Sequence, residues 1–473
     1  MDIFEEYLAT ELAEMAKGKP RGVFEAAFIL REALKYSPGD PVLMTKLANV
    51  IMTRCPSWAA YSLAKEAYGL SPNPKARHLI SLVEDPPLPR QVTFEVSTVC
   101  NLRCPLCENG SGRMTYPKKF MPVEEFKVIW DKLRPSTKGL ILVGMGETFL
   151  HPDVYEILRY VKGTPYVYID TNGNVPLDCE EIINSGIDEF TFSIDGVTQE
   201  MYERYRIGGN LERALRNVRD LVEAKRRRKA AKPSIVFKFV VFRHTEMYVE
   251  EAMHLAQSLG ADQFRIEACT FRPMFGLESF KKYLPLSPNK HQRIAYVDFE
   301  KNEIGCPPGR TSRHCGAVLS SMMVTVRGEV SPCCVANHEV MFGNLVRSSL
   351  EDVWRSPEYG RFRLQALRNR WALPVCRVCS TQQHDLGRFF EGTAFAEPPE
   401  EKSEGGSRHY VRDNFVSAQE FEDLMASGRA REALYFRSIE KVRLPEGYAA
   451  SSPDRPAGPL AAGPEDAPAS SLP

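Results

Sequence analysis

The sequence predicts an α/β fold of the partial (β/α)6 barrel type. Three observations support this prediction. Six apolar runs rich in β-branched and aromatic residues lie between residues 91 and 270, amphipathic segments separate them, and each run is as short as a strand buried on both faces. Regular alternation of this kind is typical of parallel sheets, and six units suit a partial barrel better than the eight of a complete one.

The six strand-like runs are VTFEVS, GLILVGMG, YVYIDTN, EFTFSID, SIVFKFVVF and QFRIEA. The segments between them include PVEEFKVIWDKL, VYEILRYVK and VEEAMHLAQSLG, in which apolar residues recur at helical spacing. In such folds the functional site lies at the carboxyl ends of the strands. Residues 91–270 are therefore the expected catalytic core.

Composition restricts the class of partner. The chain has 473 residues, of which 43% are hydrophobic, and its 61 basic residues equal its 61 acidic ones. It is large enough for two or three domains and has no net field that would attract nucleic acid. The N-terminus, MDIFEEYLATELAEMAKGK, lacks the basic and apolar regions of a signal peptide, and no apolar run is long enough to span a membrane. We expect a cytoplasmic protein without nucleic-acid or membrane partners.

An internal repeat precedes the core. Residues 21–40 align without a gap on residues 55–74, an offset of 34 residues that matches the tetratricopeptide period. Residues 1–85 are therefore predicted to be a tetratricopeptide-like helical module. Two repeats are marginal alone, so the module is expected to lean on the next domain. It serves either as a docking site for a protein partner or as a packing cap.

The remaining segments are predicted to be mainly linkers and connectors. EDPPLPRQ, residues 84–91, is a Pro-rich boundary, and residues 271–314 are a turn-rich connector. Residues 391–447 are predicted to hold a linker and one amphipathic helix over 416–436, and residues 448–473 a disordered tail. The basic run KRRRK at 225–229 is interpreted as a solvated helix face.

Twelve cysteines in a reducing compartment indicate metal ligation more than disulfides. Cys100, Cys104 and Cys107 form one group directly after the first strand-like run. A second group consists of Cys315, Cys333, Cys334, Cys376 and Cys379. The other four, Cys55, Cys179, Cys269 and Cys306, are interpreted as inert thiols.

The first group lacks a fourth ligand. A structural zinc site uses four ligands, usually in CxxC pairs, so CxxxCxxC without a nearby fourth Cys or His fits zinc poorly. Three thiolates on a four-iron cluster would leave one iron open to another ligand. The spacing therefore favours a cluster that binds substrate or cofactor.

These cysteines, together with segments at successive strand ends, resemble the radical S-adenosylmethionine (radical SAM) enzymes. Leu106 takes the apolar position of the family motif, and GMGETFLHPD resembles its GGEP segment, with Gly144, Gly146 and Glu147 in place and Thr148 where Pro is usual. In TFSIDG, Ser193 takes the ribose-side position and Asp195 lies beside it. The resemblance implies that Cys100, Cys104 and Cys107 hold a 4Fe–4S cluster. It implies that the other residues named bind S-adenosylmethionine (SAM).

The family resemblance also implies an activity. Reductive cleavage of SAM gives a 5′-deoxyadenosyl radical that abstracts hydrogen from a substrate, and an electron donor such as flavodoxin or ferredoxin supplies the electron. Glu267, Arg272 and His244 point toward the expected cavity only if the strand phase is right. No catalytic acid or base is assigned.

The second cysteine group resembles the SPASM or twitch extension of the same enzymes. Cys315, Gly328 and Cys333 have its spacing, and the knuckle Cys376 to Cys379 follows. Two further Cys of the full pattern are missing, so we predict one auxiliary 4Fe–4S cluster on Cys315, Cys333, Cys376 and Cys379. Cys334 competes with Cys333, although adjacent side chains on an extended backbone point apart. A four-Cys zinc site is the alternative for this group.

Three functions remain open. A fully ligated auxiliary cluster suits an electron acceptor, and the single-cluster arrangement resembles radical dehydrogenases, so oxidation, epimerisation or deoxygenation of a sugar- or aminocyclitol-like alcohol ranks first. A SPASM-type peptide maturase is the alternative. The third reading is a non-catalytic iron–sulfur electron carrier or scaffold.

Overall fold

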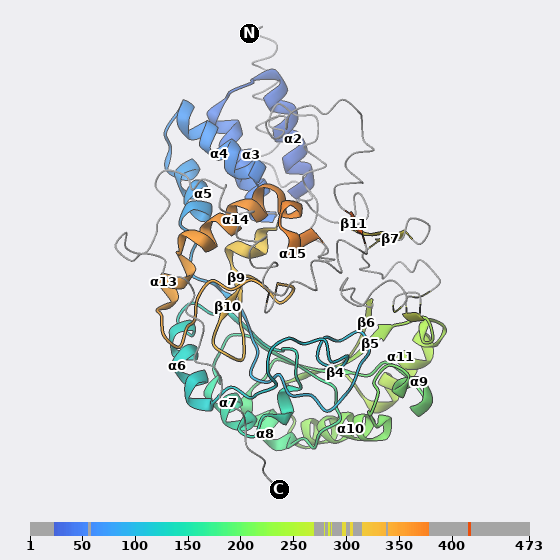
Figure 1. Ribbon diagram of the computed structural model, residues 1–473. Coiled ribbons are helices and arrows are strands. Elements are labelled where there is room, and N and C mark those ends of the chain that lie inside the picture. Colours follow the sequence, from blue (N-terminus) through green and yellow to red (C-terminus); the bar gives the residue numbers. More distant parts are fainter. Residues whose placement is uncertain are drawn as a thin grey trace.

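The computed structural model describes residues 23–54, 58–268, 279, 282–283, 285, 296–298, 303–305, 315–336, 339–377 and 415–417 (Figure 1). Several predictions fall outside these residues. They concern the first 22 residues, most of the 271–314 connector with Arg272, the auxiliary ligand Cys379, and the C-terminal tail.

Four consecutive helices form the N-terminal part of the described chain. They are α2 (Val23–Tyr36), α3 (Pro41–Arg54), α4 (Trp58–Leu70) and α5 (Pro74–Glu84). Each packs against the next one. The small residues of the sequence repeat lie at these contacts, since Ala33, Ala60 and Ala67 are all fully buried. The tetratricopeptide assignment itself stays a prediction.

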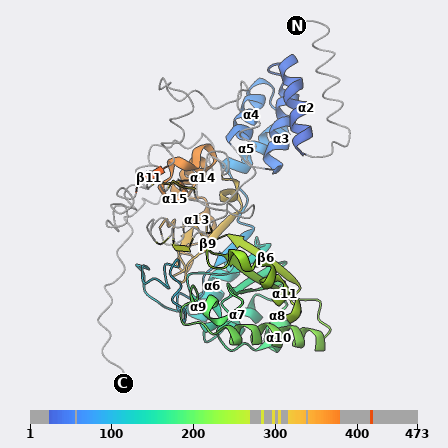
Figure 2. The ribbon, with the colours of Figure 1, turned by 90° about the vertical axis from the view of Figure 1, so that its right-hand side faces the viewer.

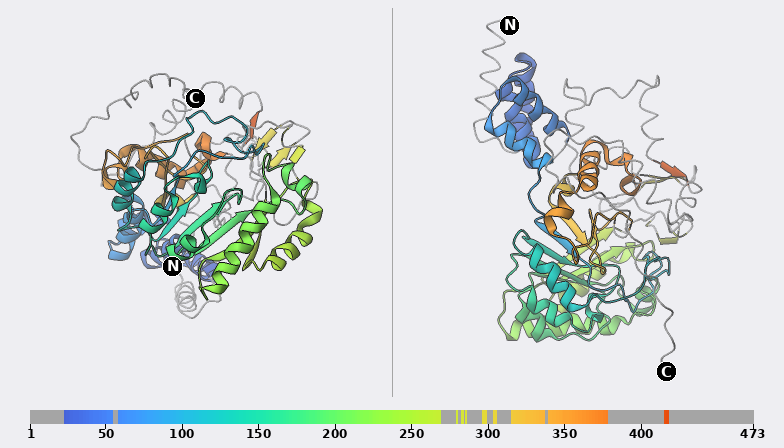
Figure 3. Two further views of the ribbon diagram at one scale, coloured as in Figure 1. Left: turned by 90° about the horizontal axis from the view of Figure 1, so that it is seen from below. Right: turned by 60° about the vertical axis from the view of Figure 1, so that its left-hand side comes forward.

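Six parallel strands follow, as predicted, and each pairs with its sequence neighbour. They are β1 (Gln91–Phe94), β2 (Gly139–Leu142), β3 (Val167–Thr171), β4 (Glu189–Ser193), β5 (Ser234–Val241) and β6 (Gln263–Ala268). The longer helices between them are α6 (Val123–Leu133), α7 (Val154–Tyr160), α8 (Cys179–Ser185), α9 (Gln199–Glu203), α10 (Leu211–Arg227) and α11 (Val249–Leu259). Seen from below, these helices line the outside of the curved sheet (Figure 3). The predicted partial barrel is confirmed.

The core lies between the sheet and its helices. Phe190 and Phe192 of β4 and Phe237 and Phe239 of β5 alternate with polar residues and are fully buried. Trp130 of α6 is buried as well. Alternation with period two places these aromatic rings on the helix-facing side of the sheet and their polar neighbours on the inner side.

The sheet contains two further strands that we did not predict. β9 (Ser321–Val324) pairs in parallel with β1, and β10 (Val330–Ser331) pairs antiparallel with β9. The buried Glu95 reinforces this junction, because its carboxylate accepts from Met145 N (2.8 Å) and from Val326 N (3.1 Å). The C-terminal domain therefore covers the edge of β1 that would otherwise be open to solvent.

Helices α13 (Leu350–Trp354), α14 (Pro357–Asn369) and α15 (Pro374–Arg377) complete the described part of the C-terminal domain. They lie between the N-terminal helices and the barrel (Figure 2). Trp354 Nε1 donates to the carbonyls of Pro86 (3.3 Å) and Pro87 (3.1 Å), and Arg355 pairs with Asp85 at 3.0 Å. These contacts hold residues 85–87, directly after α5, and α14 also contacts α4.

A small separate sheet corrects one expectation. β7 (Tyr296–Asp298), β8 (Glu303–Gly305) and β11 (Phe415–Ser417) form three antiparallel strands. Val416 and Ser417 were expected to begin a helix but belong to β11. The pairing of β11 with β8 outweighs the helical pattern of the residues that follow, because local propensity is weaker than strand pairing at such a point.

Carboxylates lie beside the basic run at residues 225–229. Lys225 pairs with Asp262 at 2.7 Å and Arg227 with Glu180 at 2.7 Å, so neighbouring carboxylates neutralise part of KRRRK.

Within the described ranges, no helix has the length and apolar character needed to cross a bilayer.

Candidate active site

The loop after β1 carries the first cysteine group. Cys104 is buried, and Cys100 and Cys107 are partly buried. The loop is pinned at both ends: Arg103 N donates to Ile207 O at 3.0 Å, and Asn109 Nδ2 donates to Thr98 O at 2.8 Å. Asn109 Nδ2 also reaches the carbonyl of Met145, after β2, at 2.7 Å. The cysteine loop is therefore fixed against neighbouring strand ends.

Burial is the main influence on the pKa values of the Cys100 and Cys104 thiols. It raises the pKa of Cys100, and it raises the pKa of Cys104 to about 12 although the cation of Arg206 acts in the opposite direction. A thiolate ligand must lose its proton, so metal binding has to supply the missing stabilisation. In the described part of the chain, no three Cys, His, Asp or Glu side chains converge as ligands of a single ion. A 4Fe–4S cluster does not require such convergence, because each of its thiolates binds a different iron.

The glycine segment after β2 lies directly against the cysteine loop. Gly146 N donates to Ser97 O (3.1 Å), and Glu147 N donates to Val99 O (2.8 Å). A Cβ at Gly146 would stand 2.5 Å from Ser97 O, and one at Gly144 would stand 2.3 Å from Cγ of Glu95. Both glycines are thus needed for close packing of the two segments, whatever the cofactor requires.

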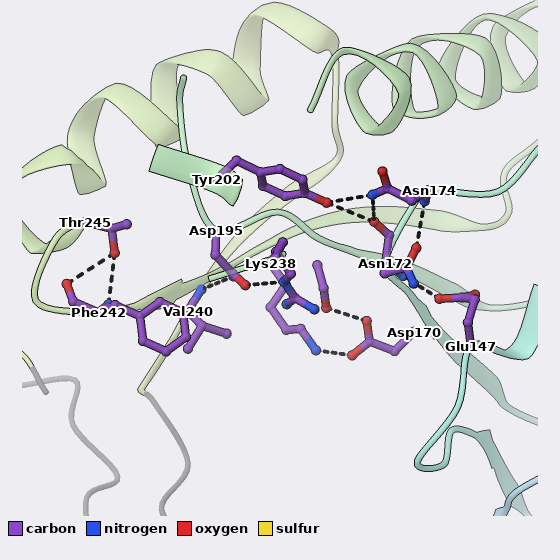
Figure 4. A network of polar contacts seen from close by, with 12 residues as sticks. Glu147, Asp170, Asn172, Asn174, Asp195, Tyr202, Lys238, Val240, Phe242 and Thr245 are labelled. Atoms are coloured by element: carbon purple, nitrogen blue, oxygen red, sulfur yellow. Dashed lines mark hydrogen bonds and ion pairs between the residues drawn. The ribbon is translucent and has the colours of Figure 1, made fainter. Parts of the chain in front are cut away.

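Glu147 is buried and holds the turn after β3. Its carboxylate accepts from Phe149 N (3.1 Å), Thr171 Oγ1 (2.8 Å) and Asn172 N (2.8 Å). Figure 4 shows the contact with Asn172. Burial raises its pKa even though these three donors favour the ionised form. A carboxylate has about four acceptor positions, so little capacity is left for a cofactor ammonium group. The predicted cofactor contact of Glu147 stays a prediction, and the observed contacts give it a positioning role.

An asparagine network, which we did not predict, connects Glu147 to the cysteine loop. Asn172 Nδ2 donates to Asn101 Oδ1 at 2.9 Å and lies 3.9 Å from Cys100 Sγ. Asn174 Nδ2 donates to the hydroxyl of Tyr202 at 2.7 Å. Asn172 thus links two of the predicted site residues, Cys100 and Glu147. The sequence signal was the polar run TNGN at a strand end.

Asp195 is fully buried and has both oxygens engaged. Oδ1 accepts from Val240 N at 2.9 Å and Oδ2 accepts from Arg206 Nε at 2.5 Å (Figure 4). Burial opposes the charge of Arg206, and Asp195 and Cys104 raise its pKa above the usual value. Asp195 therefore anchors the strand end and holds a cation near the cysteine loop. Its direct contact with SAM remains a prediction.

Ser193, at the end of β4, donates to Asp170 Oδ1 at 2.7 Å, and Lys238 Nζ contacts Asp170 Oδ2. Asp170 and Lys238 were not predicted, although each stands out as a charge within an apolar strand. Leu106 is 7% exposed within the cysteine loop, which is compatible with its predicted packing role.

The second cysteine group lies on the C-terminal domain. Cys315 N donates to Ala366 O and Cys376 N to Leu373 O, each at 2.9 Å. Cys333 is partly buried against the core, whereas Cys334 is exposed. This difference favours Cys333 as the ligand. The ligand set itself stays a prediction, since its fourth member, Cys379, lies outside the described residues.

Two family models match the chain. Residues 94–256 match the model described as the radical SAM superfamily, and residues 315–380 match SPASM, described as an iron-sulfur cluster-binding domain. The two ranges contain the two cysteine groups and the strand-end segments described above.

Relatives of known function are distant. An AdoMet-dependent heme synthase of Methanosarcina barkeri is 30% identical over 38% of this chain and 50% of its own length. The subtilosin biosynthesis protein AlbA of Bacillus subtilis is 25% identical over 60% of this chain and 64% of its own. The chain thus spans less than two thirds of both relatives. The crystal structure of Streptococcus suis SuiB bound to S-adenosylmethionine aligns with a TM-score of 0.47 and 14% identity, over 76% of this chain and 88% of that one.

The two family-model matches agree with the loop of three cysteines, the strand-end segments and the second cysteine group. The chain therefore contains a radical SAM domain and a SPASM domain, and domains of these two kinds imply a 4Fe–4S cluster, SAM and an auxiliary cluster.

Proposed function

We propose that the enzyme oxidises, epimerises or deoxygenates a polar alcohol of the sugar or aminocyclitol class. The observation that carries this proposal is the inner face of the sheet. Parallel strands covered on both sides are usually apolar on both faces, but here β3, β4, β5 and β6 present charged and hydroxyl side chains inward. A substrate that lies against such a face gains from many hydrogen-bonding groups.

The charges of the inner face are paired and partly accessible. Asp170 faces Lys238, with side chains 14% and 11% exposed, and Arg265 lies 2.7 Å from Glu189, with side chains 32% and 13% exposed. The helix-facing aromatic residues of β4 and β5 are fully buried. Solvent therefore reaches the inner side of the sheet, and a hydroxyl-rich molecule could replace it without leaving polar groups unpaired.

The protein residues have separable tasks in this proposal. Cys100, Cys104 and Cys107 would hold the cluster, and when bound the cofactors supply a 5′-deoxyadenosyl radical and, at the auxiliary site, an acceptor for one electron. Glu147 fixes the turn after β3 beside the cysteine loop. Arg206 keeps a positive charge near Cys104, which favours its thiolate form.

A second candidate function is peptide maturation. It is supported by the relative from Bacillus subtilis, whose name assigns it to biosynthesis of the bacteriocin subtilosin. The exposed apolar side chains Val42 and Leu70, 58% and 57% exposed, give the N-terminal helices a surface that a peptide or protein partner could use. Contacts of Trp354 and Arg355 with the end of the module support the packing-cap reading instead.

Two further inferences follow from the cofactors. An electron donor of the flavodoxin or ferredoxin type would reduce the cluster. Thiol ligands persist in a reducing compartment, so we place the protein in the cytoplasm.

Deuterium transfer would test the proposal. The reconstituted, reduced enzyme is incubated with SAM and a panel of hexoses and aminocyclitols that carry deuterium on their carbinol carbons, and 5′-deoxyadenosine is analysed by mass spectrometry. Deuterium in that product supports alcohol chemistry. Transfer only from a deuterated peptide pool would support maturation, and SAM cleavage with no transfer from any alcohol would refute the first proposal. A Cys104→Ala variant controls for non-enzymatic cleavage.

A further inference from the structure

Three neighbouring strands bring Asp170, Ser193 and Lys238 together on the inner face. Ser193 of β4 is the register partner of Lys238 of β5, and Asp170 lies on β3, the strand on the other side of β4. Figure 4 shows the side chain of Lys238 directed at the carboxylate of Asp170. Ser193 Oγ donates to Asp170 Oδ1 at 2.7 Å, and Lys238 Nζ contacts Oδ2.

These contacts fix the direction of every hydrogen bond. An ionised carboxylate only accepts, so Ser193 must use its single hydroxyl proton toward Asp170. Lys238, with its side chain 11% exposed, forms an ion pair with Asp170 and holds the carboxylate in place. Ser193 Oγ is then left with lone pairs and no proton to offer. It can only accept from a further partner.

The position of this hydroxyl indicates the partner. Ser193 ends β4, and Asp195 two residues later is bound to Arg206 beside Cys104. Asp170 is followed directly by Thr171 and Asn172, which hold Glu147. The serine therefore stands between two segments that border the cysteine loop, and the family resemblance assigns the ribose of SAM to this strand end.

We propose that Asp170 and Lys238 are positioning residues that make Ser193 an obligatory hydrogen-bond acceptor for one ribose hydroxyl of SAM. The negative charge on Asp170 also polarises the serine, which strengthens it as an acceptor. This inference rests on the predicted cofactor contact of Ser193. It does not depend on whether the substrate is an alcohol or a peptide.

The test compares dissociation constants on cluster-loaded protein by anaerobic equilibrium dialysis. The ligands are SAM and its 2′-deoxy and 3′-deoxy analogues, and the readout is the ratio of the analogue constant to that of SAM. In the wild type we expect one analogue to bind about tenfold more weakly, as loss of one good hydrogen bond implies. In Ser193→Ala that ratio should fall to near one.

The double variant Asp170→Leu, Lys238→Met tests the positioning residues. It removes both charges together, so no buried charge is left alone and the fold should persist. Because its serine is free to rotate, we expect the ratio to fall to about threefold or less. Ser185→Ala, a buried serine of α8 whose hydroxyl bonds to Ile182 O at 2.6 Å, should keep the wild-type ratio.

Three results would overturn the inference, at two different points. A full tenfold ratio in Ser193→Ala, or ratios near one for both analogues in the wild type, would remove the ribose contact itself. A loss in Ser193→Ala with an unchanged ratio in the double variant would keep the contact and exclude Asp170 and Lys238 as its positioning residues.

Discussion

Replacement of Arg206 by Met should destabilise the enzyme strongly, because it isolates a buried carboxylate. Asp195 has no exposed surface, and the variant would remove the Arg206 Nε contact at 2.5 Å while leaving only the backbone donor of Val240 at 2.9 Å. Removing one partner of a buried pair typically costs about 3–5 kcal/mol. Since the Arg206 side chain is 14% exposed and some water can reach the vacated position, we expect the lower end of that range.

Urea unfolding of the cluster-free protein, followed by circular dichroism, would measure this loss. The matched control is Arg159→Met, which removes a surface pair with Glu181 at 2.6 Å whose side chains are 57% and 35% exposed, and which should change stability by less than about 1 kcal/mol. The double variant Asp195→Asn, Arg206→Met should recover about 2 kcal/mol relative to additivity. If Arg206→Met were no more harmful than Arg159→Met, the assignment of Asp195 as a structural anchor would be refuted.

Three other predictions concern the cysteines and pH. Cys104→Ala should abolish SAM cleavage while keeping the auxiliary iron, and Cys179→Ala on the outer helix α8 should cleave normally; native activity in Cys104→Ala would contradict the cluster assignment. Iron and sulfide analysis should show loss of about four irons in Cys333→Ala and none in Cys334→Ala; the reverse pattern would exchange the two ligands. Burial lowers the pKa of His151 from 6.5, so its contribution to the free energy of unfolding is present above pH 6.5 and declines as pH falls through the folded-state value. The pH slope of unfolding should flatten in His151→Gln, and an unchanged slope would show that other groups cause it.

The sequence was sufficient for the barrel but not for the junction between domains. The six strands were predictable because each is a short apolar run between amphipathic segments. The place of β9 beside β1 was not, because Ser321 and Gln91 are register partners across more than two hundred residues of chain. Local patterns contain no information about such a pairing.

The same distinction holds at the site. The cysteine loop and the glycine segment could be placed, since their spacing is local. The orientations of the Asp195 and Glu147 side chains could not be predicted. Asp195 is oriented by Arg206 and Glu147 by Asn172, and these partners come from other parts of the chain. The contacts of Glu147 and Asp195 with the surrounding backbone were therefore not predicted, and their contacts with the cofactor stay predictions.

The shared sheet has a consequence for how the enzyme unfolds. Without residues 321–331, the apolar strand β1 would present a bare ladder of amide and carbonyl groups, and Glu95 would lose its bond to Val326. The radical SAM core and the SPASM domain should therefore melt in a single calorimetric transition. Replacing either domain by an unrelated one would therefore also require changes in β1, which pairs with β9.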